Sequence, residues 1–191
     1  MYTRILFTAA MALVLVWTAY AGGVTNIKSV YNTSSKKVMV SAFDNKSLAE
    51  NGNNNWLKTS VVTGGGCYWF GDMWVPWADN ARQFSSHNIR IEIYDGDPAR
   101  GNHTATFFGI YQTGEEIRVI TIPRDGSFPG QHWGDEYARR YFSATAPRVE
   151  GEWRSGGERN IHFYNKKDGS IGFRFEQYSP PPRDLVISGC R

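Results

Sequence analysis

The sequence predicts an all-β fold: a single-domain antiparallel β-sandwich of about nine or ten strands, with a partly closed β-barrel as the alternative. Beyond residue 21 the chain contains 11 Ile and 10 Val but only three Leu. It also contains 24 Phe, Trp and Tyr in that region. Because β-branched and aromatic side chains suit pleated strands and leucine favours helices, this composition indicates β structure. Short alternating runs separated by turn-forming residues support the same class.

Residues 1–21 have the pattern of a secretory signal peptide. Arg4 provides a positive head, residues 5–17 are an apolar run, and Ala19 and Ala21 match the small residues that a signal peptidase requires. This run is shorter than the roughly 20 residues that span a bilayer. We therefore expect a secreted, extracellular protein whose single β-sandwich domain covers residues 22–191.

Nine runs are expected to form strands, and most show the alternation of a half-buried sheet. They are 24–31, 38–43, 56–63, 89–94, 104–112, 116–122, 161–165, 171–178 and 184–188. The run at 104–112 is apolar on both faces, which predicts a central strand. Asp168 and Gly169 between two runs predict a hairpin turn, and residues 135–142 are expected to form one or two helical turns.

The clearest alternating run contains Ile89, Ile91 and Ile93. These side chains are expected to point into the core, with Arg90 and Glu92 pointing outward to solvent.

Two cysteines, Cys67 and Cys190, are expected to form a disulfide, because an exported chain enters an oxidising compartment. The bridge would tie the C-terminal tail to the middle of the domain. A free nucleophilic Cys67 is the alternative, but its neighbours are glycines and aromatic residues, which do not lower a thiol pKa.

An aromatic cluster is the most distinctive feature for function. The candidate ligand-binding residues are Tyr68, Trp69, Trp74, Trp77, Trp133 and Tyr137. Exposed tryptophans stack on sugar rings or sit at a membrane interface. Alternatively, the rings fill a core that is poor in leucine. Gly71 and Asp72 are expected to form a turn that divides the cluster.

The sequence carries few signals of catalysis or of charged partners. Removing Arg4 leaves 20 basic and 18 acidic residues, a net charge of +2, which does not support nucleic-acid binding. There is no nucleophile elbow, and the histidines His87, His103, His132 and His162 have no metal-site spacing. Neither a cofactor nor a metal is expected, although calcium at Asp95 and Asp97 stays open.

Three sequons mark candidate glycosylation sites, at Asn32, Asn45 and Asn102. If the host glycosylates this protein, their loops are expected to face solvent.

The pattern favours a secreted, non-catalytic binding module, most of all for carbohydrate, bound through an aromatic-rich surface. A membrane-binding or pore-forming protein of the same fold is the alternative, and a small secreted hydrolase is the second alternative. In composition and architecture the chain resembles small secreted β-sandwich proteins, including lectins and membrane-binding cytolysins. Such a resemblance concerns the fold and does not by itself supply function.

Overall fold

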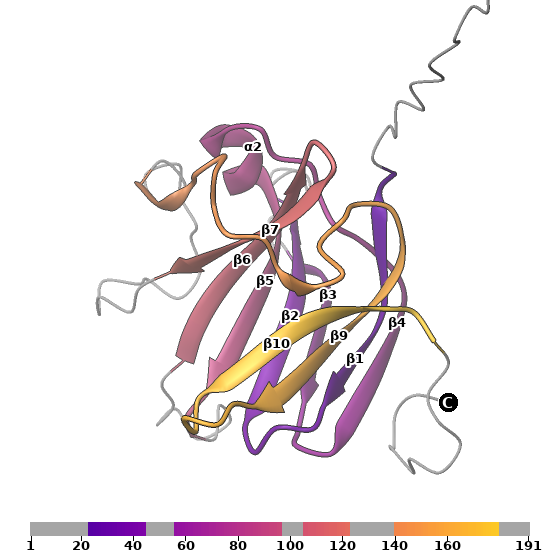
Figure 1. Ribbon diagram of the computed structural model, residues 1–191, viewed down its shortest axis with the longest axis vertical. Helices are drawn as coiled ribbons and strands as arrows, with labels where there is room; N and C mark the ends of the chain where they lie inside the picture. The colour runs from indigo at the N-terminus through magenta and orange to yellow at the C-terminus, as the bar shows by residue number, and fades with distance from the viewer. Residues whose placement is uncertain (1–22, 45–55, 97–104, 123–139, 180–191) are drawn as a thin grey trace, which may run out of the picture.

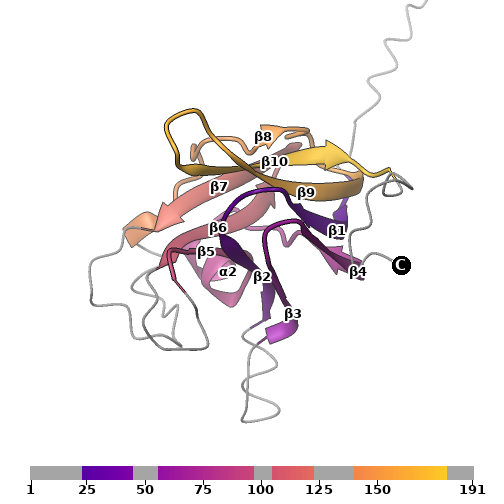
Figure 2. The same ribbon diagram turned by 90° about the horizontal axis from the view of Figure 1, so that it is seen from below.

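Two five-stranded sheets face each other in the computed structural model, which describes residues 23–44, 56–96, 105–122 and 140–179. Figures 1 and 2 show the two layers from two directions. The sheets do not close into a barrel, so the predicted β-sandwich is confirmed. The described residues form ten strands, in agreement with the expected number.

The first sheet, sheet A, has the strand order β4-β1-β9-β10-β8. Its strands are β1 (Thr25–Asn32), β4 (Gly66–Trp74), β8 (Glu150–Gly151), β9 (Gly157–Asn165) and β10 (Ile171–Gln177). Two of its pairs, β1 with β9 and β10 with β8, are parallel. Sheet A is therefore mixed rather than antiparallel throughout, because β9 lies beside the first strand and runs parallel to it.

The second sheet, sheet B, is antiparallel throughout and has the order β3-β2-β5-β6-β7. Its strands are β2 (Lys37–Asp44), β3 (Trp56–Val62), β5 (His87–Tyr94), β6 (Ala105–Thr113) and β7 (Glu116–Ile122). As predicted from its two apolar faces, β6 has a neighbour on both sides. The expected strand at 184–188 lies outside the described residues, and the domain limits 22–191 stay a prediction.

The main core fills the space between the sheets. Ile27, Val30, Ile161 and Phe163 of sheet A belong to one buried cluster with the apolar side chains of sheet B. The sheet B contribution includes Val38, Val40, Ile89, Ile91 and Ile93. The three isoleucines of β5 point inward, as predicted. Such interdigitating inner faces are what hold a sandwich together.

The prediction that Arg90 and Glu92 point to solvent is wrong. Both side chains lie on the face of β5 opposite the isoleucines, yet their relative exposures are only 3% and 5%. Arg90 Nε lies 2.8 Å from Glu92 Oε1, and the Tyr94 hydroxyl donates to Glu92 Oε2 at 2.5 Å. The guanidinium also lies over the Phe107 ring, 4.7 Å from its centroid. Alternation identifies the two faces of a strand, but it does not say whether the second face is covered.

The outer face of sheet B carries a second apolar cluster, which α2 (Ala81–Ser86) helps to cover (Figure 2). Phe84 of α2 packs edge to face against Tyr111, with ring centroids 5.4 Å apart. Asn80 caps the helix by accepting a hydrogen bond from the Gln83 amide. The helix was not predicted, since six residues are too few to show a helical period.

The hairpin predicted at Asp168 and Gly169 connects β9 to β10. The Lys166 amide donates to the Ser170 carbonyl, and Gly169 has a φ of 82°. The Asp168 carboxylate accepts from the Ser170 amide and hydroxyl, which closes the turn. Of the helical turns expected at 135–142, residues 140 and 141 are helical and 135–139 lie outside the described residues.

The segment before β9 joins one edge of each sheet. Val119 donates to Pro147 and Ile117 donates to Trp153, which attaches the segment to β7. On its other side Gly151 pairs with Phe175 of β10. A Cβ at Gly151 would lie 2.2 Å from the Phe175 carbonyl oxygen, so only glycine permits this approach. The opposite edges of the two sheets are β4 and β3, and β4 carries most of the predicted aromatic site.

Candidate functional site

A bulge in β4 sets the direction of the aromatic side chains. On β1, Ile27 pairs with Met73 and Ser29 pairs with Trp69. A single β1 residue therefore lies opposite three β4 residues, and Gly71 in the middle has a φ of 76°. The turn expected at Gly71 and Asp72 is thus not formed: β4 continues to Trp74 and absorbs the extra residues as a bulge.

The bulge places two tryptophans on one face. Phe70 and Met73 are three residues apart, yet both are buried in the core. Trp69 and Trp74 point the other way, away from sheet B, with 41% and 55% of their surface exposed. We name these two side chains the aromatic surface. It lies on the outer face of sheet A. Its strand, β4, is the edge strand of that sheet (Figure 1).

The structure places the other predicted aromatic residues elsewhere. Tyr68 is exposed, but it pairs with the core residue Val30 and packs edge to face against Phe70, so it faces the inner side at the sheet edge. Trp77 is also exposed and lies beyond β4, where it bridges to Gln112 at the end of β6. Trp133 and Tyr137 lie outside the described residues.

A network of charged and polar groups lies beside the aromatic surface. Lys28, the residue opposite the bulge, bridges Asp72 at 2.9 Å and Glu158 at 3.1 Å. These hydrogen bonds, first to Asp72 and then to Glu158, raise the pKa of the Lys28 ammonium. Asn26 donates to Asp72 at 2.6 Å and accepts from the Met73 amide, which fills the bulge with polar contacts. The Asp72 and Glu158 side chains are at least half exposed.

Two side chains hold the Trp69 indole in place. The Lys28 ammonium lies 5.7 Å from its ring centroid, and Tyr178 packs against it with centroids 5.6 Å apart. After β10 the chain crosses the outer face of sheet A, where the Ser179 carbonyl accepts from the Tyr31 hydroxyl and from Asn160. The Trp69 indole is therefore held in a defined position in the absence of a ligand.

A second polar cluster on the same face surrounds His162, one of the four histidines without metal-site spacing in the sequence. Its Nδ1 lies 3.0 Å from Glu176 Oε1 and its Nε2 lies 2.8 Å from the Thr33 hydroxyl. Arg174 also contacts Glu176, at 2.7 Å. Although burial opposes the shift, the bonds from His162 and Arg174 lower the pKa of Glu176. Sequence reasoning missed this cluster. It could have been found from the register of the hairpin predicted at Asp168 and Gly169, which pairs His162 with Arg174.

The His162 cluster joins three strands. The Thr33 hydroxyl also lies 2.9 Å from the Phe163 carbonyl oxygen, and the next two amides are bonded to the side chains of Asn32 and Asn165. A hydroxyl bonded to an imidazole that is itself held by a carboxylate has the general layout of an activated nucleophile. Here the Thr33 hydroxyl and the Ser35 amide bond to β9, and the Ser34 amide bonds back to Asn32, which indicates a structural role.

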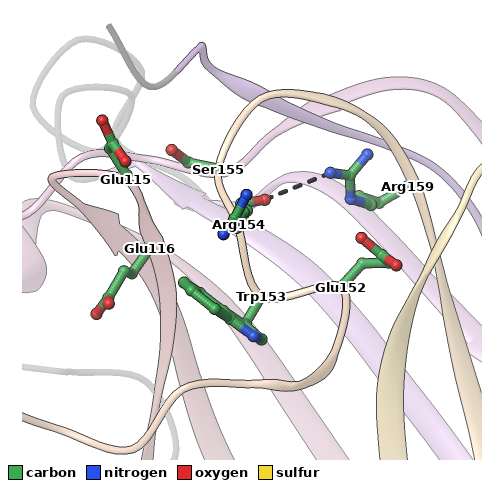
Figure 3. Close-up of a pocket in the computed structure, with 7 residues that line it drawn as sticks. All are labelled: Glu115, Glu116, Glu152, Trp153, Arg154, Ser155 and Arg159. Atoms are coloured by element: carbon green, nitrogen blue, oxygen red, sulfur yellow. Dashed lines mark hydrogen bonds between the residues drawn. The ribbon is translucent and has the colours of Figure 1, made fainter. Parts of the chain in front are cut away.

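A pocket of about 400 Å³ opens at the joined edge of the two sheets (Figure 3). Its lining residues are Glu115, Glu116, Glu152, Trp153, Arg154, Ser155 and Arg159. The Trp153 ring is stacked against Arg148, whose guanidinium carbon lies 3.9 Å from the ring centroid, and Arg159 donates to the Arg154 carbonyl at 3.4 Å. The pocket is highly charged and contains none of the residues that the sequence predicts to bind a ligand.

The remaining chemistry-bearing residues do not form a site among the described residues. There, no group of three His, Cys, Asp or Glu is placed to hold a metal. Asp95 is ion-paired with Lys36 at 3.3 Å, and Asp97 lies outside the described part of the chain. None of the described helices is long and apolar enough to span a membrane.

Asn32 is unsuited to glycosylation in this fold, because it is the last residue of β1 and not part of a solvent-facing loop. The side chain is fully buried. Its amide group donates to the carbonyls of Lys36 and Val62 and accepts from Ser34, so that a glycan at this nitrogen is incompatible with the packing. Asn45 and Asn102 lie outside the described residues.

Cys67 is buried on β4, and the described residues contain no free cysteine. Its expected partner Cys190 lies outside the described residues, so the bridge stays a prediction.

The fold is therefore that of a mixed β-sandwich with an exposed aromatic edge strand. No family model, no curated protein and no solved structure matches this chain.

Proposed function

We propose that this protein is a secreted carbohydrate-binding module and that the aromatic surface is where it binds. The observation that carries the proposal is the exposure of Trp69 and Trp74 on one face of β4, beside the network of Lys28, Asp72 and Glu158. A sugar ring has an apolar C–H face, which stacks on an indole, and a rim of hydroxyls, which bond to carboxylates and ammonium groups. The surface offers both kinds of partner.

The charges favour carbohydrate over a membrane as the partner. Interfacial tryptophans act together with Lys and Arg when they anchor a protein to anionic lipid. Beside the aromatic surface one ammonium stands against two carboxylates, a net charge of −1. Such a surface repels an anionic bilayer, whereas sugar hydroxyls bond to either sign of charge.

Secretion is part of the proposal and rests on the sequence of residues 1–21. N-terminal sequencing of the protein recovered from the culture medium should begin near Gly22. Protein retained in cells with Met1 intact would contradict export.

A glycan array with the folded mature protein tests the proposed function. We expect binding by the native protein, and at least about tenfold weaker binding by Trp74→Ala, because truncating a central aromatic anchor typically costs about 2 kcal/mol. Val61→Ala is the matched control, since Val61 is equally exposed but lies on β3 of the other sheet. No glycan binding by a folded protein would refute the proposal.

Two further assays distinguish the alternatives. Co-sedimentation with liposomes and dye release would indicate the membrane-active protein. Release of sugars or amines from a broad substrate panel would indicate a hydrolase.

A further inference from the structure

Resting on this proposed function, we infer that the ligand is an extended, uncharged, β-1,4-linked polysaccharide chain lying along β4. The alternative within the same function is a single terminal sugar held at one tryptophan. The direction of the aromatic surface, its openness and its charge each bear on this choice.

The aromatic surface is longer than one sugar ring. Trp69 and Trp74 pair with Ser29 and Asn26, which are three positions apart on β1. At about 3.3 Å per strand residue the two tryptophan backbones are separated by about 10 Å. A ligand that stacks on both indoles must therefore contain several linked sugars.

The two indoles are exposed rather than recessed. Trp69 and Trp74 are 41% and 55% exposed and lie on the edge strand of sheet A, so a sugar that stacks on them need not be the end of a chain. An enclosed site would instead select the end of a chain. The pocket beside Trp153 is a separate feature, and β4 contributes no residue to it.

The shape of the ligand follows from two indoles on one strand. In a β-1,4-linked chain the equatorial linkages keep successive rings in a flat, straight ribbon. Its C–H faces can meet both indoles at once. An α-1,4-linked glucose chain curves into a helix, which turns its later rings away from the second indole.

The charges select an uncharged chain. The Lys28 ammonium is already shared by Asp72 and Glu158, so the network carries a net charge of −1. Polyuronates and sulfated glycans would be repelled. The hydroxyl groups of an uncharged chain can donate hydrogen bonds to the exposed carboxylates and meet no charge repulsion.

The test is a series of β-1,4-linked oligosaccharides of glucose and of N-acetylglucosamine, from monosaccharide to hexasaccharide, measured by calorimetry. For at least one of these sugars, affinity should rise roughly hundredfold between the disaccharide and the hexasaccharide, because a second contact on one chain acts at high effective concentration. Equal affinity for short and long chains would overturn the inference. So would a preference for α-1,4-linked glucose chains or for polygalacturonate.

Variants show whether both tryptophans contribute. Trp69→Ala and Trp74→Ala should each reduce hexasaccharide affinity to about the level of the disaccharide, whereas Val61→Ala should leave it unchanged. If only one of the two tryptophans matters at every chain length, the extended mode is wrong although the protein still binds sugar. If no carbohydrate of any length binds, the proposed function fails as well.

Discussion

At the scale of single residues, the buried pair Arg90 and Glu92 departs most from what the sequence indicates. Period-two alternation correctly assigned the isoleucines of β5 to the core. The same alternation predicts that Arg90 and Glu92 face solvent, which is wrong. The second apolar cluster, on the outer face of sheet B, is built from segments that are distant in sequence. No local sequence pattern therefore predicts that this face of β5 is covered.

Removing one member of this pair should be strongly destabilising. Glu92→Ala would leave Arg90 buried without its carboxylate and should cost about 3–5 kcal/mol. Replacing both charges with Arg90→Met and Glu92→Leu should restore much of this loss. Urea denaturation of the single and double variants measures the difference, and a single variant as stable as the native protein would contradict the buried pair.

A second residue-scale prediction concerns acid stability. Glu116 contacts Arg148 and Arg118, and these bonds lower the pKa of its carboxyl despite opposing desolvation. The pKa of Glu116 in the folded protein therefore lies below its unfolded value of about 4.3. The stabilisation of the fold by the Glu116 carboxylate is complete above that pH and is lost as the pH falls through the folded pKa.

Glu116→Gln tests this linkage. The variant should melt at a lower temperature than the native protein at neutral pH, and the difference should shrink steadily as the pH falls below about 4.3. Thermal melts across this range provide the measurement. A difference that does not change with pH would show that the carboxylate charge makes no contribution.

At the scale of elements, most strands could be predicted because each buries one face. The bulge in β4 could not, since Gly71 followed by Asp72 is an equally good turn signal. The choice depends on β1, whose Asn26 and Lys28 bond to the bulged residues. For the same reason the sequence predicts an aromatic binding surface without showing that Trp69 and Trp74 share a face.

Gly71→Ala tests the role of the bulge. There is room for the methyl group, since the nearest atom, Trp69 Nε1, would be 3.8 Å away. The cost is therefore conformational: a positive φ of 76° with a Cβ should destabilise the fold by about 1–2 kcal/mol. Glycan affinity should fall as the two indoles lose their alignment. Gly114→Ala, at another open positive-φ glycine in the turn between β6 and β7, is the control: it should lose stability but keep affinity.

At the scale of the whole molecule, composition was enough to predict the sandwich but not the order of its strands. The parallel pairing of β1 with β9 joins residues more than 130 positions apart, and the sequence carries no local signal for it. The same holds for the segment around Gly151 that joins one edge of each sheet. The β1–β9 pairing places Glu158 of β9 within reach of Lys28 and so completes the candidate site.

The predicted bridge between Cys67 and Cys190 also acts at this scale. The native mature protein should be lighter than its reduced form by the mass of two hydrogen atoms. Cys190→Ser should lower the melting temperature and increase hydrogen exchange in β4, because the bridge would anchor that strand to the C-terminal tail. Two titratable thiols in the denatured, unreduced protein would disprove the pairing.

The most direct test of the carbohydrate surface is an NMR titration that follows the indole N–H resonances of the tryptophans. On addition of the oligosaccharide that binds best in the length series, the resonances of Trp69 and Trp74 should shift together and saturate with a single affinity. The resonance of Trp153, which lies in the pocket at the opposite edge of the sandwich, should stay in place. Shifts confined to Trp153, or none from Trp69 and Trp74 at saturation, would contradict the assignment of the binding surface to β4.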